Sequence, residues 1–186
     1  MMYLSKGLLT RSERTGLDYV SRCGCAYALG PELAGLWKKA RLTPQQVPVD
    51  KERVIKRLEA SGLVVTTEET GALAVYRLLT GCVICPNGRR WTDLILPKTA
   101  RRIWMWINEA GLRLTASELI RLEEQQVKPT PGLLGEDGRQ RLTEMIYLPE
   151  TILDGILETL MEHSPARDAT AAALLKLLRT RRLLLI

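Results

Sequence analysis

The chain has 186 residues, 46% of them hydrophobic and 26% charged, with a formal net charge of +6. This composition is typical of a folded globular protein and excludes a disordered one, and no apolar stretch approaches the ~20 residues of a membrane span. The excess of cations permits an anionic partner, nucleic acid included. Because no targeting segment is recognisable, we expect a cytoplasmic protein that does not act at a membrane and whose four cysteines stay reduced.

The first predicted element is a β-hairpin, and a helix follows it. Residues 7–10 and 17–20 flank a polar turn that contains Gly16. The helix is expected to begin at Pro31, because a first helical turn tolerates proline. Its apolar residues then recur at helical spacing as far as Ala40.

A second helix and two strands are predicted after a Pro-containing break. Asp50 is the expected N-cap of this helix, and Gly62 is its expected end. An apolar strand over residues 63–65 follows the helix. After a polar turn, residues 74–79 are expected to return as the antiparallel partner of that strand.

The middle segment, residues 89–131, is ambiguous. Residues 99–107 fit a helix, but together with residues 112–114 they also fit a hairpin. A helix is then predicted from Thr115, because Thr115 and Glu118 have the spacing of a capping box. A stretch with two prolines ends this helix.

The sequence repeats itself: residues 27–65 and 147–185 align without a gap. A repeated pattern of apolar positions indicates a repeated structural unit. The second copy is expected to contain a hairpin, two helices and a strand, over residues 132–143, 150–162, 168 onward and 183–186. It has no counterpart of the returning strand, so its last strand must pair elsewhere.

The predicted order of helix, turn, helix and strand hairpin is that of a winged helix–turn–helix. The segment 52–64, with its tail RLEASGLV, resembles the recognition helix and first wing strand of that superfamily. The resemblance covers roughly residues 27–80 and, more faintly, residues 147–186. It implies a winged-helix fold, which by itself does not fix a function.

The predicted fold class is therefore α+β, with two winged-helix-like lobes made by an internal duplication. Residues 1–88 would form the first lobe, and residues 132–186 the second, truncated lobe. Residues 89–131 would be a Trp- and Arg-rich segment between them.

Cations lie off the apolar stripe of the second helix in each copy: Lys51, Arg53, Lys56, Arg57, Lys176, Arg179, Arg181 and Arg182. On a recognition-type helix, such side chains contact phosphates and base edges. The sequence therefore predicts a DNA-binding protein of the kind that regulates transcription. The competing interpretation is a solvated helix face.

A second basic patch interleaves cations with tryptophans: Arg89, Arg90, Lys98, Arg101 and Arg102 with Trp91, Trp104 and Trp106. Such a pattern can bind single-stranded nucleic acid by stacking and by phosphate contact. The plainer interpretation is that the tryptophans are buried and the arginines lie over them.

The alternative function is a non-enzymatic protein-interaction adaptor or secretion chaperone. Glu68 and Glu69 lie at the predicted wing tip, where carboxylates would repel phosphate. The truncated second copy would also leave a strand edge open to a partner strand. The partner is then a protein, and a homodimer is one form of this alternative.

The four cysteines form two close pairs, Cys23 with Cys25 and Cys82 with Cys85. Four thiolates could close a tetrahedral structural zinc site, and alternatively the cysteines are small buried hydrophobes. We expect no other cofactor and no enzyme activity. His163 is the only histidine, and the chain has no Gly-rich phosphate loop.

Overall fold

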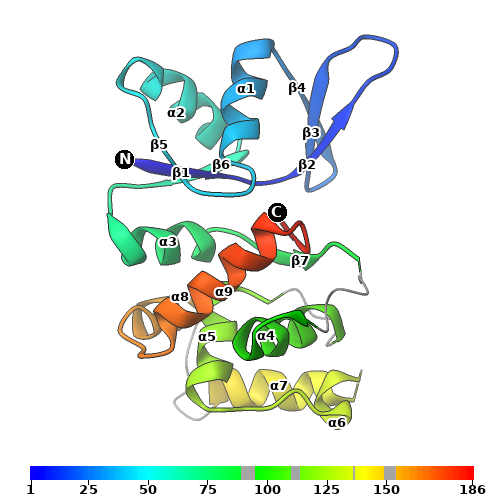
Figure 1. Ribbon diagram of the computed structural model, residues 1–186, viewed down its shortest axis with the longest axis vertical. Coiled ribbons are helices and arrows are strands. Elements are labelled where there is room, and N and C mark those ends of the chain that lie inside the picture. Colours follow the sequence, from blue (N-terminus) through cyan, green and yellow to red (C-terminus); the bar gives the residue numbers. More distant parts are fainter. Residues whose placement is uncertain (89–94, 110–113, 136, 149–153) are drawn as a thin grey trace.

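The computed structural model describes residues 1–88, 95–109, 114–135, 137–148 and 154–186. These residues form a mixed α and β fold, which confirms the α+β class in its general form (Figure 1). Among the helices of these residues, none combines the length and the hydropathy that crossing a membrane requires.

The strand β1 (Met2–Ser5) is the centre of the sheet that divides the molecule. It pairs antiparallel with β5 (Gln45–Gln46) on one side and with β6 (Val64–Thr67) on the other. Successive side chains of a strand face opposite ways. Tyr3 therefore belongs to the core on one face of the sheet, and Leu4 belongs to the core on the other face.

The smaller core lies above this sheet in Figure 1. It is covered by β2 (Leu8–Arg11), β3 (Asp18–Arg22), β4 (Cys25–Leu29), α1 (Pro31–Lys39), the 3₁₀ turn η1 (Val49–Lys51) and α2 (Glu52–Ala60). Buried Trp37 donates from Nε1 to the carbonyls of Lys6 (3.2 Å) and Leu63 (3.1 Å), which fixes α1 to the sheet. The predicted first hairpin and both helices of this part are confirmed.

The larger core lies below the sheet and gathers helices from the rest of the chain (Figure 1). They are α3 (Gly71–Thr80), α4 (Lys98–Glu109), α5 (Ala116–Glu124), α6 (Pro131–Leu134), α7 (Gly138–Tyr147), α8 (Asp154–Met161) and α9 (Arg167–Arg179). The ambiguous residues 99–107 lie within α4. The predicted capping box is confirmed: Glu118 donates its backbone N–H to Thr115 Oγ1 (3.3 Å), and Thr115 N–H donates to the Glu118 carboxylate (2.6 Å).

Two segments predicted to form strands are helical instead. Residues 74–79 lie inside α3, and β6 takes β1 as its antiparallel partner in their place. Of residues 132–143, predicted to form a hairpin, residues 132–134 lie in α6 and residues 138–143 lie in α7. A Cβ added at Gly138 would lie 2.6 Å from the carbonyl oxygen of Gly132, so the missing side chain of Gly138 lets α7 begin close against α6.

The strand β8 (Leu183–Leu185) pairs antiparallel with β7 (Ile84–Pro86). On its other side, Gly7 N–H donates to the carbonyl of Leu185 (2.7 Å). The open strand edge predicted for the second copy is therefore wrong at Leu185. The same hydrogen bond joins the last strand to the segment that follows β1.

Candidate nucleic-acid interface

Two of the four cations at α2 that were predicted to bind DNA form ion pairs with carboxylates instead. Lys51 Nζ lies 2.8 Å from the Glu32 carboxylate, and Lys56 Nζ lies 2.6 Å from the Glu52 carboxylate. Hydrogen bonding to these carboxylates raises the pKa of both lysines. The other two cations, which are exposed, are Arg53 and Arg57.

An open groove of about 650 Å³ beside α2 is rich in carboxylates. The acidic residues that line it are Glu59, Glu68, Glu69 and Glu158. Glu59 also accepts a hydrogen bond from Thr66 Oγ1 on β6. The surface from α2 to the groove is thus mixed in charge, and its acidic part would repel a phosphate backbone.

The end of α9 presents three exposed cations and one buried cation. Lys176, Arg179 and Arg181 are exposed, whereas Arg182 is only 6% exposed. Arg179 Nε donates to Thr43 Oγ1 (3.0 Å), which connects α9 to the loop after α1. From residue 169 to residue 186 the sequence contains no acidic side chain. Lys176 and Arg179 are therefore placed to meet an external anion, and buried Arg182 is not.

A basic groove of about 440 Å³ lies along α4, the helix that packs against α9. Its cations are Lys98, Arg101, Arg102 and Lys128, and its apolar residues are Leu96, Met105 and Pro129. Arg102 is engaged, because its Nε donates to the Glu123 carboxylate (2.6 Å). Lys98, Arg101 and Lys128 are exposed.

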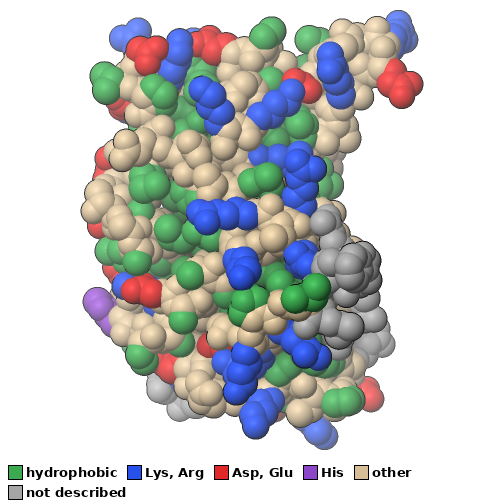
Figure 2. All heavy atoms as spheres, viewed as in Figure 1, with side chains coloured by type: hydrophobic (Ala, Val, Ile, Leu, Met, Phe, Trp, Pro, Cys, Tyr) green, Lys and Arg blue, Asp and Glu red, His purple; other side chains and the backbone are tan. Residues whose placement is uncertain are grey.

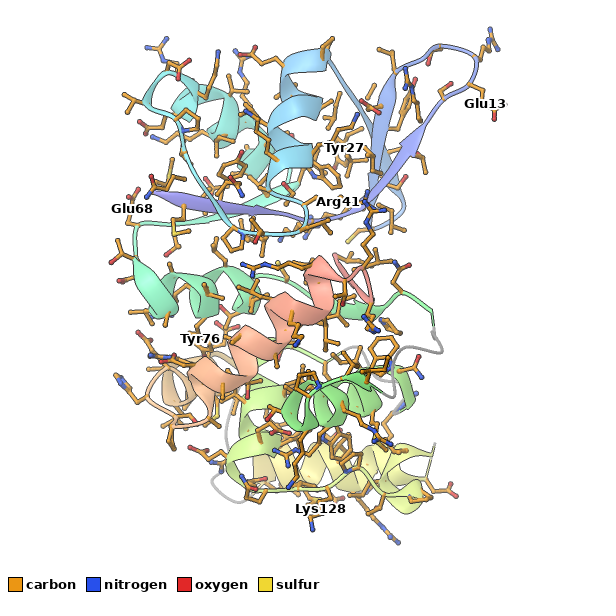
Figure 3. All side chains as sticks on the ribbon, in the orientation of Figure 1. Glu13, Tyr27, Arg41, Glu68, Tyr76 and Lys128 are labelled. Carbon is orange, nitrogen blue, oxygen red and sulfur yellow. The ribbon has the colours of Figure 1, made fainter. Side chains whose placement is uncertain are left out.

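Together these exposed cations define a surface that we call the basic face: Lys98, Arg101, Lys128, Lys176, Arg179 and Arg181. Figure 2 shows Lys and Arg side chains running down this face over α9 and α4, with most of the Asp and Glu side chains towards the edges of the view. In Figure 3, Arg41 lies at the level of the dividing sheet and Lys128 at the far end of the larger core.

The second basic patch of the sequence contributes Lys98 and Arg101 to the basic face but none of its described tryptophans. Trp104 and Trp106 are 4% and 0% exposed, so they pack in the larger core and cannot stack on bases. Arg89, Arg90 and Trp91 lie outside the described residues. Lys128 belongs to no basic motif of the sequence, and it joins the basic face only because the end of α5 brings it beside α4.

The structure does not bring the cysteines together as a metal site. Cys23 and Cys25 are exposed at the turn between β3 and β4, whereas Cys82 and Cys85 are buried. Cys82 Sγ donates to the carbonyl of Leu78 (3.3 Å), and burial raises the pKa of this thiol to about 12. Among the described residues, no three His, Cys, Asp or Glu side chains are grouped so that they could hold a metal ion.

The chain was compared with protein-family models, with curated proteins and with solved structures, and it matches none of them.

Proposed function

We propose that the protein binds nucleic acid, with duplex DNA as the expected ligand, and that the basic face is its binding surface. The observation that carries this proposal is the joining of cations from two packed helices, α4 and α9, on one exposed face. Phosphate contacts by such cations supply most of the affinity of non-specific binding. The α2 helix has a smaller role in this proposal than the sequence predicted, because its lysines are paired with carboxylates.

We also infer that the two halves descend from one duplicated unit of strand, helix, helix and strand. The first unit is β1–α1–α2–β6, and the second is β7–α8–α9–β8. Both helix pairs end in the same type of turn. Leu63 N–H donates to the Leu58 carbonyl (2.8 Å), and Arg182 N–H donates to the Leu177 carbonyl (2.9 Å). These turns correspond one residue out of step with the sequence repeat.

The strand pairing in the proposed units differs from the pairing that the winged-helix resemblance implied. In each unit the strand after the second helix pairs with a strand that precedes the unit's helices, where the resemblance implied a hairpin after them. The equivalent helices α2 and α9 then differ in how their cations are paired: Lys51 and Lys56 beside and in α2 are paired with carboxylates, whereas the ion pair of α9 lies in its first turn, at Arg167 and Asp168. This difference supports nucleic-acid binding through α9 and the basic face, with α2 taking no part.

Anisotropy of a labelled duplex, measured at ~50 and ~200 mM salt, tests the proposal with two matched variants. K176Q/R179Q removes two cations of α9, and R53Q/R57Q removes two cations of α2. We expect the α9 variant to weaken binding roughly tenfold at low salt and to reduce the salt slope by about 2. The α2 variant should bind as the unchanged protein does.

Two results would contradict the proposal. If the unchanged protein does not bind the duplex at the lower salt concentration, the basic face does not bind DNA. If both double variants weaken duplex binding by the same factor, the binding depends on the net charge of the protein and is not localised to the basic face. A single strand of the same sequence, tested in parallel, shows whether base pairing is needed.

A protein partner is the second candidate, favoured by one apolar surface. Leu148 is 62% exposed and lines an open groove of about 560 Å³ together with Leu133 and Met145. Exposed apolar grooves of this kind seat partner side chains, including those of a second copy. Sedimentation velocity of the unchanged protein and of Leu148→Glu tests self-association. If both proteins sediment as monomers, the homodimer is excluded as the form of this candidate.

A further inference from the structure

The dividing sheet has one edge that no described strand covers. Its strand order is β5–β1–β6, so among the described residues β6 has a strand partner on one side only. Lys6 N–H donates to the Leu63 carbonyl (3.0 Å), and the direction of backbone hydrogen bonding alternates along an antiparallel strand. The N–H and carbonyl groups of Val64 and Thr66 therefore point away from β1, to what we call the free edge.

An open groove runs along this free edge. It is the groove of about 650 Å³ described above, and its lining includes all four residues of β6 together with residues from the ends of α2 and α3. Figure 1 shows α2 above the sheet and α3 below it. The free edge thus lies between two helices, where an extended chain could take up its hydrogen bonds.

The composition of β6 suits the addition of a strand. Its sequence is Val-Val-Thr-Thr, and all four residues are β-branched, which favours extended backbone. The strand contains none of the lysine or proline residues that commonly protect strand edges from pairing. Nothing in its sequence therefore opposes pairing with another chain.

Carboxylates beside the free edge define the charge of a partner. Glu59 belongs to α2, whereas Glu158 belongs to α8, and the Glu158 carbonyl accepts a hydrogen bond from Tyr76 of α3. Glu69 lines the groove just beyond the end of β6. In the part of the chain that the structure describes, these three glutamates form no ion pair. They are therefore available to the cations of a partner.

The cations that line the groove have partners within the protein. Lys6 Nζ donates to the Gly81 carbonyl (2.8 Å), and Arg77 Nη2 lies 2.5 Å from the Glu162 carboxylate. The remaining carboxylate of the lining, Glu68, lies 3.4 Å from the amino group at the start of the chain. The charge that the groove offers to a ligand is therefore negative.

We propose that the free edge of β6 binds an extended segment of a partner protein that carries lysine or arginine, and that this segment joins the dividing sheet as a further strand. Successive side chains of the segment would face α2 and α3 in turn. Neighbouring cations would then meet Glu59 on one side and Glu158 on the other. The lining of the groove shares no residue with the basic face, so this site does not depend on the proposed function.

Anisotropy of a labelled octapeptide, in which pairs of lysines alternate with pairs of threonines, tests the backbone pairing. Two N-methylated forms have the same charge and four methyl groups each. Methylation of alternate residues leaves one edge of the peptide able to donate, whereas methylation of the four central residues leaves no two alternate N–H groups. We expect the first form to bind as the unmodified peptide does and the second to bind roughly tenfold more weakly.

Two matched protein variants test the charge of the groove. E59Q/E158Q removes two carboxylates beside the free edge, and E13Q/D50N removes two exposed carboxylates elsewhere. At about 50 mM salt, the groove variant should bind the unmodified peptide roughly fivefold more weakly than the unchanged protein does. The control variant should bind the peptide as the unchanged protein does.

Three results would overturn the proposal. Equal binding of the two methylated peptides would mean that charge alone holds the peptide, without strand pairing. Equal affinity of the two carboxylate variants would place the peptide outside the groove, and no peptide binding at the lower salt concentration would leave the free edge without this ligand. Duplex binding by E59Q/E158Q, measured in parallel, reports on the proposed function separately, because the groove is not part of the basic face.

Discussion

Gly7 is a residue at which a single added methyl group should be strongly destabilising. A Cβ at this position would lie 2.6 Å from Val20 Cγ1 and 3.0 Å from the Ser21 carbonyl oxygen, at a φ of +107°. We expect Gly7→Ala to lower the free energy of unfolding by about 3 kcal/mol, since overpacking adds to backbone strain. Urea unfolding followed by circular dichroism measures this loss.

Gly16 is the matched control for Gly7. It also has a positive φ, +69°, but a Cβ there would meet no atom within 4 Å. Gly16→Ala should therefore cost only the backbone strain, about 1 kcal/mol. Equal losses in the two variants would mean that contact with Val20 adds nothing.

Cys82 should make stability fall at alkaline pH. Burial raises the pKa of its thiol from 9.0 to about 12, so between these values the unfolded chain releases a proton that the folded chain keeps. The contribution of the protonated thiol to the free energy of unfolding is fully present below pH 9. It is lost as the pH rises towards 12, by about 1.4 kcal/mol per pH unit. Lys6, whose pKa is lowered by burial, titrates with the opposite sign.

Comparison with Cys82→Ala isolates the thiol, because Lys6 titrates in both proteins. The difference in unfolding free energy between the two proteins should be constant up to pH 9. Above pH 9 the unchanged chain should become less stable relative to Cys82→Ala. A difference that stays constant up to pH 10.5 would show that the thiol ionises normally in the folded state.

The elements α4 and α5 are joined by an ion pair that lies largely out of solvent. Arg102 donates to Glu123, whose side chain is 4% exposed. Removal of one partner leaves a buried charge, so Arg102→Ala should lower the free energy of unfolding by about 3 kcal/mol. The double replacement Arg102→Met with Glu123→Leu should restore most of this stability. If the double variant is as unstable as Arg102→Ala, side-chain packing explains the loss better than charge.

Elements whose signals lie in neighbouring residues were predicted correctly. Elements whose structure depends on contacts with distant parts of the chain were not. The capping box at Thr115 and the first turn at Pro31 depend on neighbours in the sequence, and both predicted helices are present. Residues 74–79 resemble a strand because they contain Val and Tyr. They form a helix whose residues Tyr76, Leu78 and Leu79 pack in the larger core, and β6 pairs with the distant strand β1.

The candidate site shows the same division. The cations of α9 and the groove cations of α4 could be found by counting charge along the chain. That Lys51 is paired with Glu32 could not be predicted, since the two residues come from different elements. The pairing of Lys56 with Glu52 had a signal, because a glutamate four residues before a lysine on a helix favours an ion pair.

For the whole molecule, β1 should make the two cores unfold together. Leu4 is fully buried in the larger core, while its neighbour Tyr3 is buried in the smaller one. Leu4→Ala should cost about 3 kcal/mol by opening a cavity. Hydrogen exchange should show the same loss of protection for amides of α2 and of α9. A loss confined to α9 would show that the cores unfold separately.

The position of β1 also has a consequence in time. A ribosome adds about 5–20 residues per second, so β6 is made some seconds after β1, and β8 some seconds after β7. During each interval a half-made sheet exposes unpaired backbone and apolar side chains such as Leu4. The nascent chain should therefore be a client for chaperones until its distant strands have been synthesised, and destabilising changes in β1 should reduce yield in cells more than they reduce the stability of the finished protein.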